Sequence, residues 1–238
     1  MSTNTNLNYI KFLKESGISF FLQNKPKKFY KENKSSNITL TKSIDEINSI
    51  QELEYLINQS DVCKLKKNAK HTVFSDGNFR SKVMLIGEAP GAEEDIQGKP
   101  FVGKAGQLLN KMLAAIGLDR KSVYITNVLP WRPPNNRTPN SEEILQCLPF
   151  IQKHIELINP NMLILLGGTA AKAILTTSNG IMKLRGRWHK YNSLYLKKSI
   201  LTRAIYHPAF LLRSPTNKKE AWEDLQEIQK KLKDNENI

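Results

Sequence analysis

The sequence predicts a three-layer α/β/α fold built around a mostly parallel sheet of four strands. Short apolar runs alternate along the chain with segments whose apolar residues recur at helical spacing. The runs are apolar at every position, which is typical of strands buried between two layers of helices. With 238 residues and 39% hydrophobic composition, the chain can bury one sizeable core.

The order of the expected elements supports this fold class. Strands are expected at residues 83–86, 123–126, 162–166 and 201–206. Helices are expected at residues 43–59, 105–116, 141–158, 169–175 and 218–232. Gly117 and Pro160 follow two of these helices, and both residue types commonly end a helix. In such folds, ligands bind at the carboxyl ends of the strands.

Two regions are expected along the chain. Residues 1–42 form an N-terminal region, with a short amphipathic helix within residues 6–23 and a basic linker at residues 24–42. Residues 43–238 are expected to form the main domain. The lysines of the linker could contact DNA, but a solvated surface explains them more simply.

The composition indicates an intracellular protein with a polyanionic partner. The formal net charge is +14, from 36 Lys and Arg against 22 Asp and Glu, which favours binding to nucleic acid. Because 28 of these cations are Lys, biased genome composition could also produce the excess. The chain shows no signal peptide or membrane-spanning stretch, so a cytoplasmic, nucleoid-associated location is expected.

Polar segments follow three of the expected strands. The segment GEAPGAEEDIQGKPFVGKAG, residues 87–106, comes after the first strand, and Asn127 with PWRPPNNRTP comes after the second. HPAFLLR, residues 207–213, comes after the fourth. Parallel strands end at one edge of the sheet, so these carboxylates, the amide and the histidine are expected to share one site.

These three segments resemble those of uracil-DNA glycosylase family 4. That family has a GEAPG-type loop followed by PFVG, a strand that ends in Asn, and a late HP-x-x-L-L-R stretch. The resemblance spans roughly residues 63–232 and is specific, because three separate motifs occur in the right order. It implies an enzyme of base excision repair that flips uracil out of DNA and hydrolyses its N-glycosidic bond.

The resemblance also implies roles for individual residues. Asn127 is expected to contact the edge of the uracil, Phe101 to stack on its ring, and Gly87 to let the backbone approach closely. His207 is expected to donate a hydrogen bond to the departing base. Taken singly, Asn127 could instead cap a turn and Phe101 could be a core residue.

A carboxylate is expected to orient the attacking water and to offset positive charge on the sugar. Glu88 is the first choice, and Glu94 follows closely. The sequence alone does not separate them.

Other residues of these loops are expected to contact DNA. Phe210, Leu211 and Leu212 form an apolar wedge suited to the space left by a flipped nucleotide, although a helix start with core leucines would give the same pattern. The cations expected near the phosphates are Lys104, Arg132, Arg137, Arg185 and Arg213.

The sequence departs from the family at its iron–sulfur cluster, which usually has four cysteine ligands. Cys63 and Cys147 match the second and fourth ligand positions, but Ser60 stands at the first and Trp131 at the third. An indole cannot ligate iron, and two thiolates do not make a four-cysteine site. We therefore expect no metal and no cofactor, with Trp131 filling the space by apolar packing.

The expected partner is uracil-containing DNA, single- or double-stranded, bound by a monomer. Two other functions fit the sequence less well. One is a DNA-binding protein with little catalytic activity, which the presence of Glu88, Asn127 and His207 together disfavours. The other is a nucleotide phosphohydrolase on the same architecture, but no GxxxxGK[ST] or HExxH sequence is present.

Overall fold

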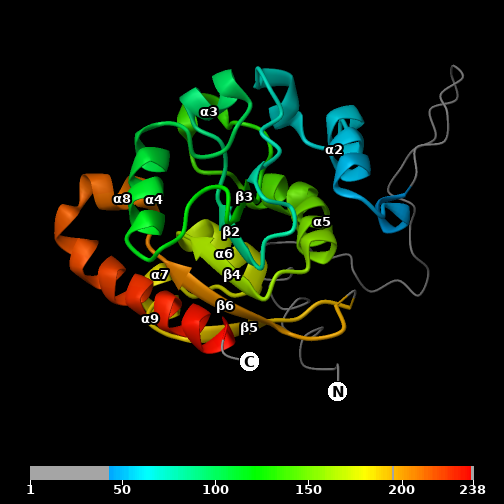
Figure 1. Ribbon diagram of the computed structural model, residues 1–238. Coiled ribbons are helices and arrows are strands. Elements are labelled where there is room, and N and C mark those ends of the chain that lie inside the picture. The colour runs from blue at the N-terminus through cyan, green and yellow to red at the C-terminus, as the bar shows by residue number, and fades with distance from the viewer. Residues whose placement is uncertain (1–42, 195, 237–238) are drawn as a thin grey trace, which may run out of the picture.

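The computed structural model describes residues 43–194 and 196–236. A six-stranded sheet with the order β1-β3-β2-β4-β6-β5 runs through its centre, and helices flank the sheet (Figure 1). The predicted α/β fold class is confirmed. The helix and linker expected within residues 1–42 lie outside the described residues.

The four predicted strands form the parallel centre of the sheet. Their bounds are Val83–Gly87 for β2, Tyr124–Asn127 for β3, Met162–Leu166 for β4 and Ile200–Ile205 for β6. Gly87 pairs in register with Asn127, and Leu166 pairs with Ile205. The carboxyl ends of these strands therefore lie along one edge, and that edge carries the predicted site.

The expected number of strands was wrong, because two more strands pair antiparallel at the edges. They are β1 (Asp76–Gly77), beside β3, and β5 (Trp188–Tyr191), beside β6. The first has two residues, and the second reads WHKY, so neither has the apolar run of a strand buried on both faces. Edge strands are commonly short and polar, which hides them from a search for apolar runs.

Helices cover both faces of the sheet. One face packs against α2 (Ile50–Gln59), α5 (Ser141–Ile158) and α6 (Gly168–Leu175). The other packs against α4 (Lys104–Ala114), α8 (Pro208–Arg213) and α9 (Lys218–Glu236). The side chains of β4 alternate between the two layers, with Leu163 on the α5 side and Ile164 on the α9 side. Figure 1 shows α4 and α9 on the side of the sheet opposite α2 and α5.

Local signals explain where the helices begin and end. In α5, the Asn140 side chain accepts from Glu143 N while the Glu143 carboxylate accepts from Asn140 N, and Asn159 closes the helix with φ 44°. The single helix expected at residues 43–59 was wrong. It is split into a 3₁₀ turn, η1 (Ile44–Glu46), and α2, which begins after the Ser49 cap. Ile47 between them has extended backbone.

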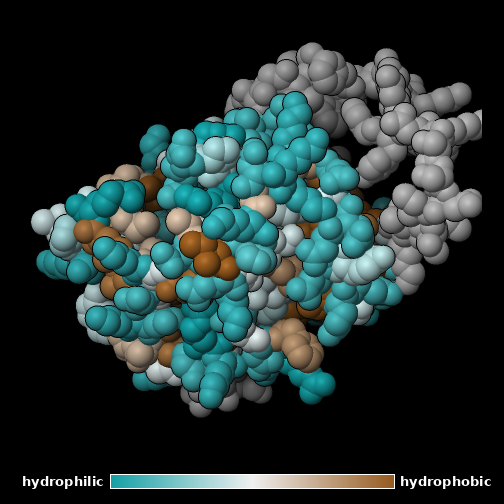
Figure 2. Space-filling view, turned by 90° about the horizontal axis from the view of Figure 1, so that it is seen from above, coloured by the Kyte–Doolittle hydropathy of each residue, from teal (hydrophilic) through white to brown (hydrophobic). Residues whose placement is uncertain are grey.

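Short helical segments join these elements. They are η2 (Lys64–Asn68), α3 (Ala92–Gln97), η3 (Pro134–Asn136), α7 (Ile181–Leu184) and η4 (Pro215–Asn217). None of the helices within the described residues is long and apolar enough to cross a membrane. Seen from the side on which α3 lies, the surface is mostly hydrophilic, and hydrophobic residues occupy only small areas of it (Figure 2).

Candidate active site

The loops that follow β2, β3 and β6 meet in one pocket at the carboxyl edge of the sheet. Its volume is about 430 Å³. The predicted residues that line it are Glu88, Glu94, Phe101, Asn127, Arg137, His207, Phe210 and Arg213. The pocket is therefore built from the three segments whose convergence the sequence predicted.

Asn127 ends β3 at the floor of this pocket. Its side chain is 5% exposed, and Oδ1 is buried without a hydrogen-bond partner within the described part of the chain. Burying such a group without a partner costs about 1–3 kcal/mol. A ligand that donates a hydrogen bond to Oδ1 would recover this energy, so the amide suits recognition better than capping.

Gly87 gives Asn127 and Phe101 the space that they occupy. A Cβ atom at Gly87 would lie 2.3 Å from Asn127 Oδ1 and 2.5 Å from the Phe101 ring. Any larger residue would push both side chains away. Gly87 thus shapes the pocket through its missing side chain.

The Phe101 ring forms a buried wall of the pocket beside His207. Its side chain is 5% exposed, and the two ring centroids lie 5.6 Å apart with an interplanar angle of 32°. Phe101 also has φ 54°, a backbone conformation that residues with a side chain seldom adopt. The core role considered for this phenylalanine is correct in part, because the ring packs in the core and still lines the pocket.

His207 is held in one tautomer. It caps the N-terminus of α8, where its Nδ1 accepts a hydrogen bond from Ala209 N at 3.1 Å. An imidazole whose Nδ1 is an acceptor carries its proton on Nε2. Burial, together with the nearby Arg213, lowers the pKa of His207 to about 4, so the ring is neutral at physiological pH. Its Nε2–H can therefore donate a hydrogen bond without adding charge.

The two candidate carboxylates have different surroundings. Glu94 Oε1 accepts from Val102 N and from Gly103 N, each at 2.9 Å, so this side chain braces the loop that carries Phe101. Glu88 is half-buried in the pocket wall. Within the described residues, its carboxylate makes no hydrogen bond or ion pair with another side chain or backbone group. Glu88 is therefore available to hold a water molecule.

Two residues expected to contact DNA have structural roles in the fold. Leu211 is 1% exposed and packs in the core on the α4 side of the sheet, so its placement in the wedge was wrong. Its neighbours differ, since Phe210 lines the pocket and Leu212 is 44% exposed. A helix turn explains the difference, because consecutive residues of α8 point in different directions.

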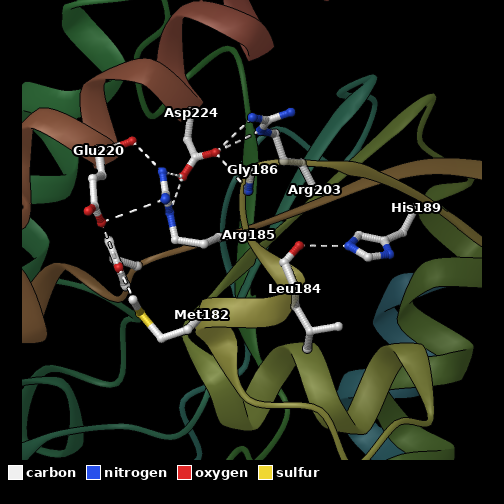
Figure 3. Close-up of polar contacts among 9 residues, drawn as sticks. Met182, Leu184, Arg185, Gly186, His189, Arg203, Glu220 and Asp224 are labelled. Carbon is white, nitrogen blue, oxygen red and sulfur yellow. Dashed lines mark hydrogen bonds and ion pairs between the residues drawn. The ribbon is translucent and has the colours of Figure 1, made fainter.

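Arg185, also expected to contact DNA, instead binds helix α9. Its Nε donates to Asp224 Oδ2 at 2.9 Å, and its Nη2 donates to the backbone oxygen of Glu220 at 2.7 Å. Figure 3 shows its guanidinium turned toward both α9 residues. Arg203 donates to the other oxygen of Asp224, which is fully buried. Arg185 therefore joins α9 to the sheet and is not available to DNA phosphates.

The remaining cations stay near the pocket. Arg137 lines it, although its guanidinium also pairs with Glu143. The Arg132 side chain donates to Asn136 Oδ1 at 2.7 Å, and Lys104 is exposed at the start of α4. Arg213 is exposed beside His207. Of these four cations, Arg137 and Arg213 line the pocket, whereas Arg132 and Lys104 do not.

The two cysteines lie together, but their surroundings do not fit a four-cysteine cluster. Cys63 and Cys147 are both buried, and their mutual hydrogen bond and burial raise the pKa of Cys147. Trp131 is 0% exposed, its Nε1 donates to Thr72 Oγ1 at 3.1 Å, and its ring meets Phe150 edge-on. The described residues contain no group of three or more His, Cys, Asp or Glu side chains that could hold a metal.

Two residues that shape the site carry no local signal in the sequence. Arg120 donates to the backbone oxygens of Pro100 and Phe101, although it follows α4 in an ordinary polar turn. Gly167, with φ 94°, lies where a Cβ would be 3.0 Å from His207 Cβ. Only the fold brings these residues next to the site, so no local motif could have found them.

The comparisons with known proteins agree with this geometry. The sequence pattern of the Uracil DNA glycosylase superfamily matches residues 74–226. The type-4 uracil-DNA glycosylase of Saccharolobus solfataricus is 41% identical over 181 residues, which cover 74% of this chain and 83% of that protein.

Two proteins of Pyrobaculum aerophilum are also similar. Its type-4 uracil-DNA glycosylase is 41% identical over 180 residues, covering 74% of this chain and 91% of that protein. Its type-5 uracil-DNA glycosylase is 29% identical over 148 residues, covering 56% and 63% respectively. The similarity is therefore greater to the type-4 enzyme than to the type-5 enzyme of the same organism.

Proposed function

The chain belongs to the uracil-DNA glycosylase superfamily, in the type-4 group, and from this we propose that it excises uracil from DNA and leaves an abasic site. The observation that carries the proposal is the buried, unpartnered Oδ1 of Asn127 in a pocket shared with Phe101 and the neutral His207. This pocket offers a partner for a flipped base, which must be recognised outside the stack.

Base selection is assigned to Asn127. Uracil presents an N3–H donor and an O4 acceptor, whereas cytosine presents an N3 acceptor and an N4–H₂ donor. An amide whose Oδ1 accepts from N3–H and whose Nδ2 donates to O4 matches uracil and opposes cytosine. Phe101 would stack on the ring of the bound base, as aromatic side chains do for unpaired bases.

The leaving group is assigned to His207. Breaking the N-glycosidic bond leaves negative charge on the uracil O2 and positive charge on the sugar. The Nε2–H of His207 would donate to the developing oxyanion, and support comes from the hydrogen bond that fixes Nδ1 as an acceptor.

Water activation is assigned to Glu88. Its carboxylate would orient the water that attacks the sugar C1′ and would offset the positive charge there. Glu94 is the weaker choice, because its Oε1 already accepts from two backbone amides. It would act by holding the loop that carries Phe101.

The DNA interface is assigned to residues around the pocket mouth. Phe210 and Leu212 would fill the space left by the flipped nucleotide, and Arg213, Arg137, Arg132 and Lys104 would contact phosphates. The net charge of +14 would add long-range attraction. A flipped base needs only one strand, so the proposed partner is uracil-containing DNA, single- or double-stranded. The protein is proposed to bind it as a monomer, in the cytoplasm at the nucleoid.

We also propose that residues 43–238 form the catalytic unit and residues 1–42 an appended region. The residues that line the pocket and the match to the Uracil DNA glycosylase superfamily, residues 74–226, both fall within residues 43–238. A chain that begins at residue 43 is therefore expected to keep the excision rate of the full chain on a short oligonucleotide. A large loss of the rate constant would assign residues 1–42 to the active unit.

The chain is further proposed to work without an iron–sulfur cluster. Support comes from Trp131, which stands at the sequence position of one family ligand and whose buried ring packs on Phe150. Purified protein is expected to contain no stoichiometric iron or acid-labile sulfide and to show no visible absorption band. Iron in a fixed ratio to protein would contradict this.

The test of the function is excision from a defined oligonucleotide. Purified protein is incubated with a single uracil in single-stranded or duplex DNA, and alkali then cleaves at abasic sites. Cleavage at the uracil and not at a matched cytosine is expected. The absence of product from both strand forms would contradict the proposal and would favour a DNA-binding protein without this activity.

Variants of Asn127 test base selection in the same assay. Asn127→Ala is expected to abolish excision, because the base loses its partner in the pocket. Asn127→Asp cannot donate to O4 but can accept from the amino group of cytosine, so it is expected to excise uracil more slowly and to gain cleavage at cytosine. An unchanged ratio of the two rates would remove Asn127 from base selection.

A further inference from the structure

Phe101 is held in a backbone conformation that its own residue type disfavours. Its φ of 54° lies in the left-handed region, where a side chain crowds the backbone. Such a residue persists only where its surroundings fix it, and residues of this kind gather at functional sites. The contacts that fix Phe101 therefore bear on the position of its ring.

Arg120 makes two of these contacts from the turn between α4 and β3. Its Nη1 donates to Phe101 O at 3.0 Å, and its Nη2 donates to Pro100 O at 2.8 Å. These two carbonyls flank the Phe101 amide nitrogen, so the guanidinium holds the peptide plane that precedes the ring as well as the one that follows it. A planar guanidinium has donors placed for such a fork, which an ammonium lacks.

Asp76 orients this guanidinium. Arg120 Nε donates to Asp76 Oδ2 at 2.7 Å, and Nη2 contacts the same oxygen. Asp76 lies on β1, which pairs with β3, so the carboxylate is fixed to the sheet. The side chains of Arg120 and Asp76 are 23% and 27% exposed, and this partial burial makes the pair less screened than one on the open surface.

The loop is held from its other side as well. Glu94 Oε1 accepts from Val102 N and Gly103 N, which follow Phe101 directly. Gly106 lies so close that a Cβ there would be 1.8 Å from Phe101 O. Arg120 thus binds the carbonyl oxygens of Pro100 and Phe101, and Glu94 binds the amide nitrogens of Val102 and Gly103. A charged side chain holds the loop at each of these two places.

We propose that Arg120, oriented by Asp76, is a positioning residue that acts through Phe101 and sets the plane on which the flipped base stacks. This inference rests on the proposed function, because it takes uracil as the ligand of the Phe101 ring. Arg120 itself does not line the pocket. Without its two hydrogen bonds, the Phe101 backbone can relax toward ordinary φ values, and the ring then leaves its place beside His207.

The first experiment measures uracil affinity as inhibition of excision by free uracil. Arg120→Ala is expected to raise the inhibition constant about tenfold, a large part of what a lost stacking contact gives. Single-turnover excision at saturating enzyme is expected to keep most of its rate, because His207 and Glu88 remain. Arg80→Ala is the matched control, since it removes the same charge from the neighbouring loop, where Arg80 lies over the Phe79 ring.

A double-mutant cycle separates positioning from general stability. In a Phe101→Ala background, Arg120→Ala is expected to change the inhibition constant less than twofold, because no ring is left to position. A tenfold effect that persists in that background would overturn the proposal, as would wild-type uracil affinity in Arg120→Ala. Asp76→Asn and Arg120→Lys are expected to give smaller increases in the same direction, and they carry the test if Arg120→Ala does not fold.

A measurement that needs no substrate tests the positioning role of Arg120 independently of the proposed function. With 4-fluorophenylalanine at position 101, the fluorine resonance is expected to shift and broaden in Arg120→Ala and to stay unchanged in Arg80→Ala. If the wild-type protein excises no uracil, the function fails but this result stands. An identical resonance in wild type and Arg120→Ala would overturn the positioning role by itself.

Discussion

At the scale of single residues, the site depends on one histidine whose environment makes it an uncharged donor. His207 combines an Nδ1 that accepts from Ala209 N with a pKa lowered to about 4 by burial and Arg213. A neutral donor can stabilise an oxyanion as it forms without attracting a counterion beforehand. The tautomer, and not only the residue type, therefore belongs to the proposed mechanism.

His207→Ala is expected to lower the single-turnover excision rate by about 10²–10³, the usual effect of losing one donor to an oxyanion. The Asn127 and Phe101 contacts remain in this variant, so uracil affinity is expected to change far less. The two values come from single-turnover kinetics and from inhibition by free uracil. A loss of affinity as large as the loss of rate would place His207 in base binding.

The pH profile tests the protonation state of the same residue. Because the pKa of His207 is about 4, the excision rate of the wild type is expected to stay flat between about pH 6 and pH 8 with respect to this group. A histidine with an ordinary pKa would produce a bend near 6.5. Such a bend in the wild type, absent from His207→Ala, would show that a charged imidazole takes part.

The missing side chain of Gly87 leaves the space in which Asn127 and Phe101 lie. Gly87→Ala places a Cβ 2.3 Å from Asn127 Oδ1 and 2.5 Å from the Phe101 ring, so both proposed base contacts must move. The expected loss in kcat/KM is about 10²-fold, as for other small misplacements at an active site. Gly180→Ala is the control, because a Cβ at that position meets nothing within 4 Å and its φ is −73°. Equal activity of both variants would contradict this account of the pocket.

At the scale of elements, one buried carboxylate fastens the last helix to strand β6 of the sheet. Asp224 of α9 is 0% exposed and accepts from Arg185, which follows α7, and from Arg203 of β6 (Figure 3). The neighbouring Tyr206 donates to Glu220, also on α9. Tyr206 directly precedes His207, so the same attachment supports the strand end that carries the proposed donor.

Asp224→Ala is expected to lower the free energy of unfolding by about 3–5 kcal/mol, because two arginines lose their partner in a buried place. Asp61→Ala is the comparison, since its side chain is 84% exposed and its contact with Lys66 is 3.8 Å long. That change is expected to stay within about 0.5 kcal/mol. Urea unfolding measures both, and similar values for the two variants would contradict the structural role of Asp224.

The elements also show what the sequence could and could not predict. The strands of the sheet centre and α5 were predictable, because an apolar run or a cap pair such as Asn140 and Glu143 is a local signal. The break at Ile47 and the edge strand β5 were not, since their form depends on what they pack against. Tertiary context decides such segments.

The same limit applies to the site. Motifs indicated Asn127, Phe101 and His207, and the pocket contains all three. The HPAFLLR motif predicted both Leu211 and Leu212 in the DNA wedge, because a motif does not show which face of α8 meets the core. The motifs also could not predict the contacts of Arg185 and Arg120, because their partners Asp224 and Phe101 lie 39 and 19 positions away in the sequence.

At the scale of the whole molecule, two buried histidines link stability to pH. Burial lowers the pKa of His154 to about 3, and His154 lies between Tyr124 and Phe74. Burial and the nearby Arg213 lower the pKa of His207 to about 4. Both are neutral in the folded protein, whereas the unfolded chain binds protons below about pH 6.5. Stability is therefore complete above that pH and is lost as the pH falls toward 4.

The expected size of this effect is about 2 kcal/mol for each histidine between pH 7.5 and pH 5, measured by urea unfolding at both values. His154→Gln removes one of the two groups and is expected to reduce the difference by about half. A pH dependence as steep in the variant as in the wild type would show that other groups cause it.

The packing of Trp131 has a consequence for how the protein matures in the cell. Its buried ring contacts Thr72 and Phe150 and completes, from the polypeptide alone, the core cluster that also contains Cys147. On the proposal that no cluster is bound, the newly made chain needs no delivery of iron and sulfide before it becomes active. We expect the yield of active protein to be the same in cells starved of iron as in well-supplied cells.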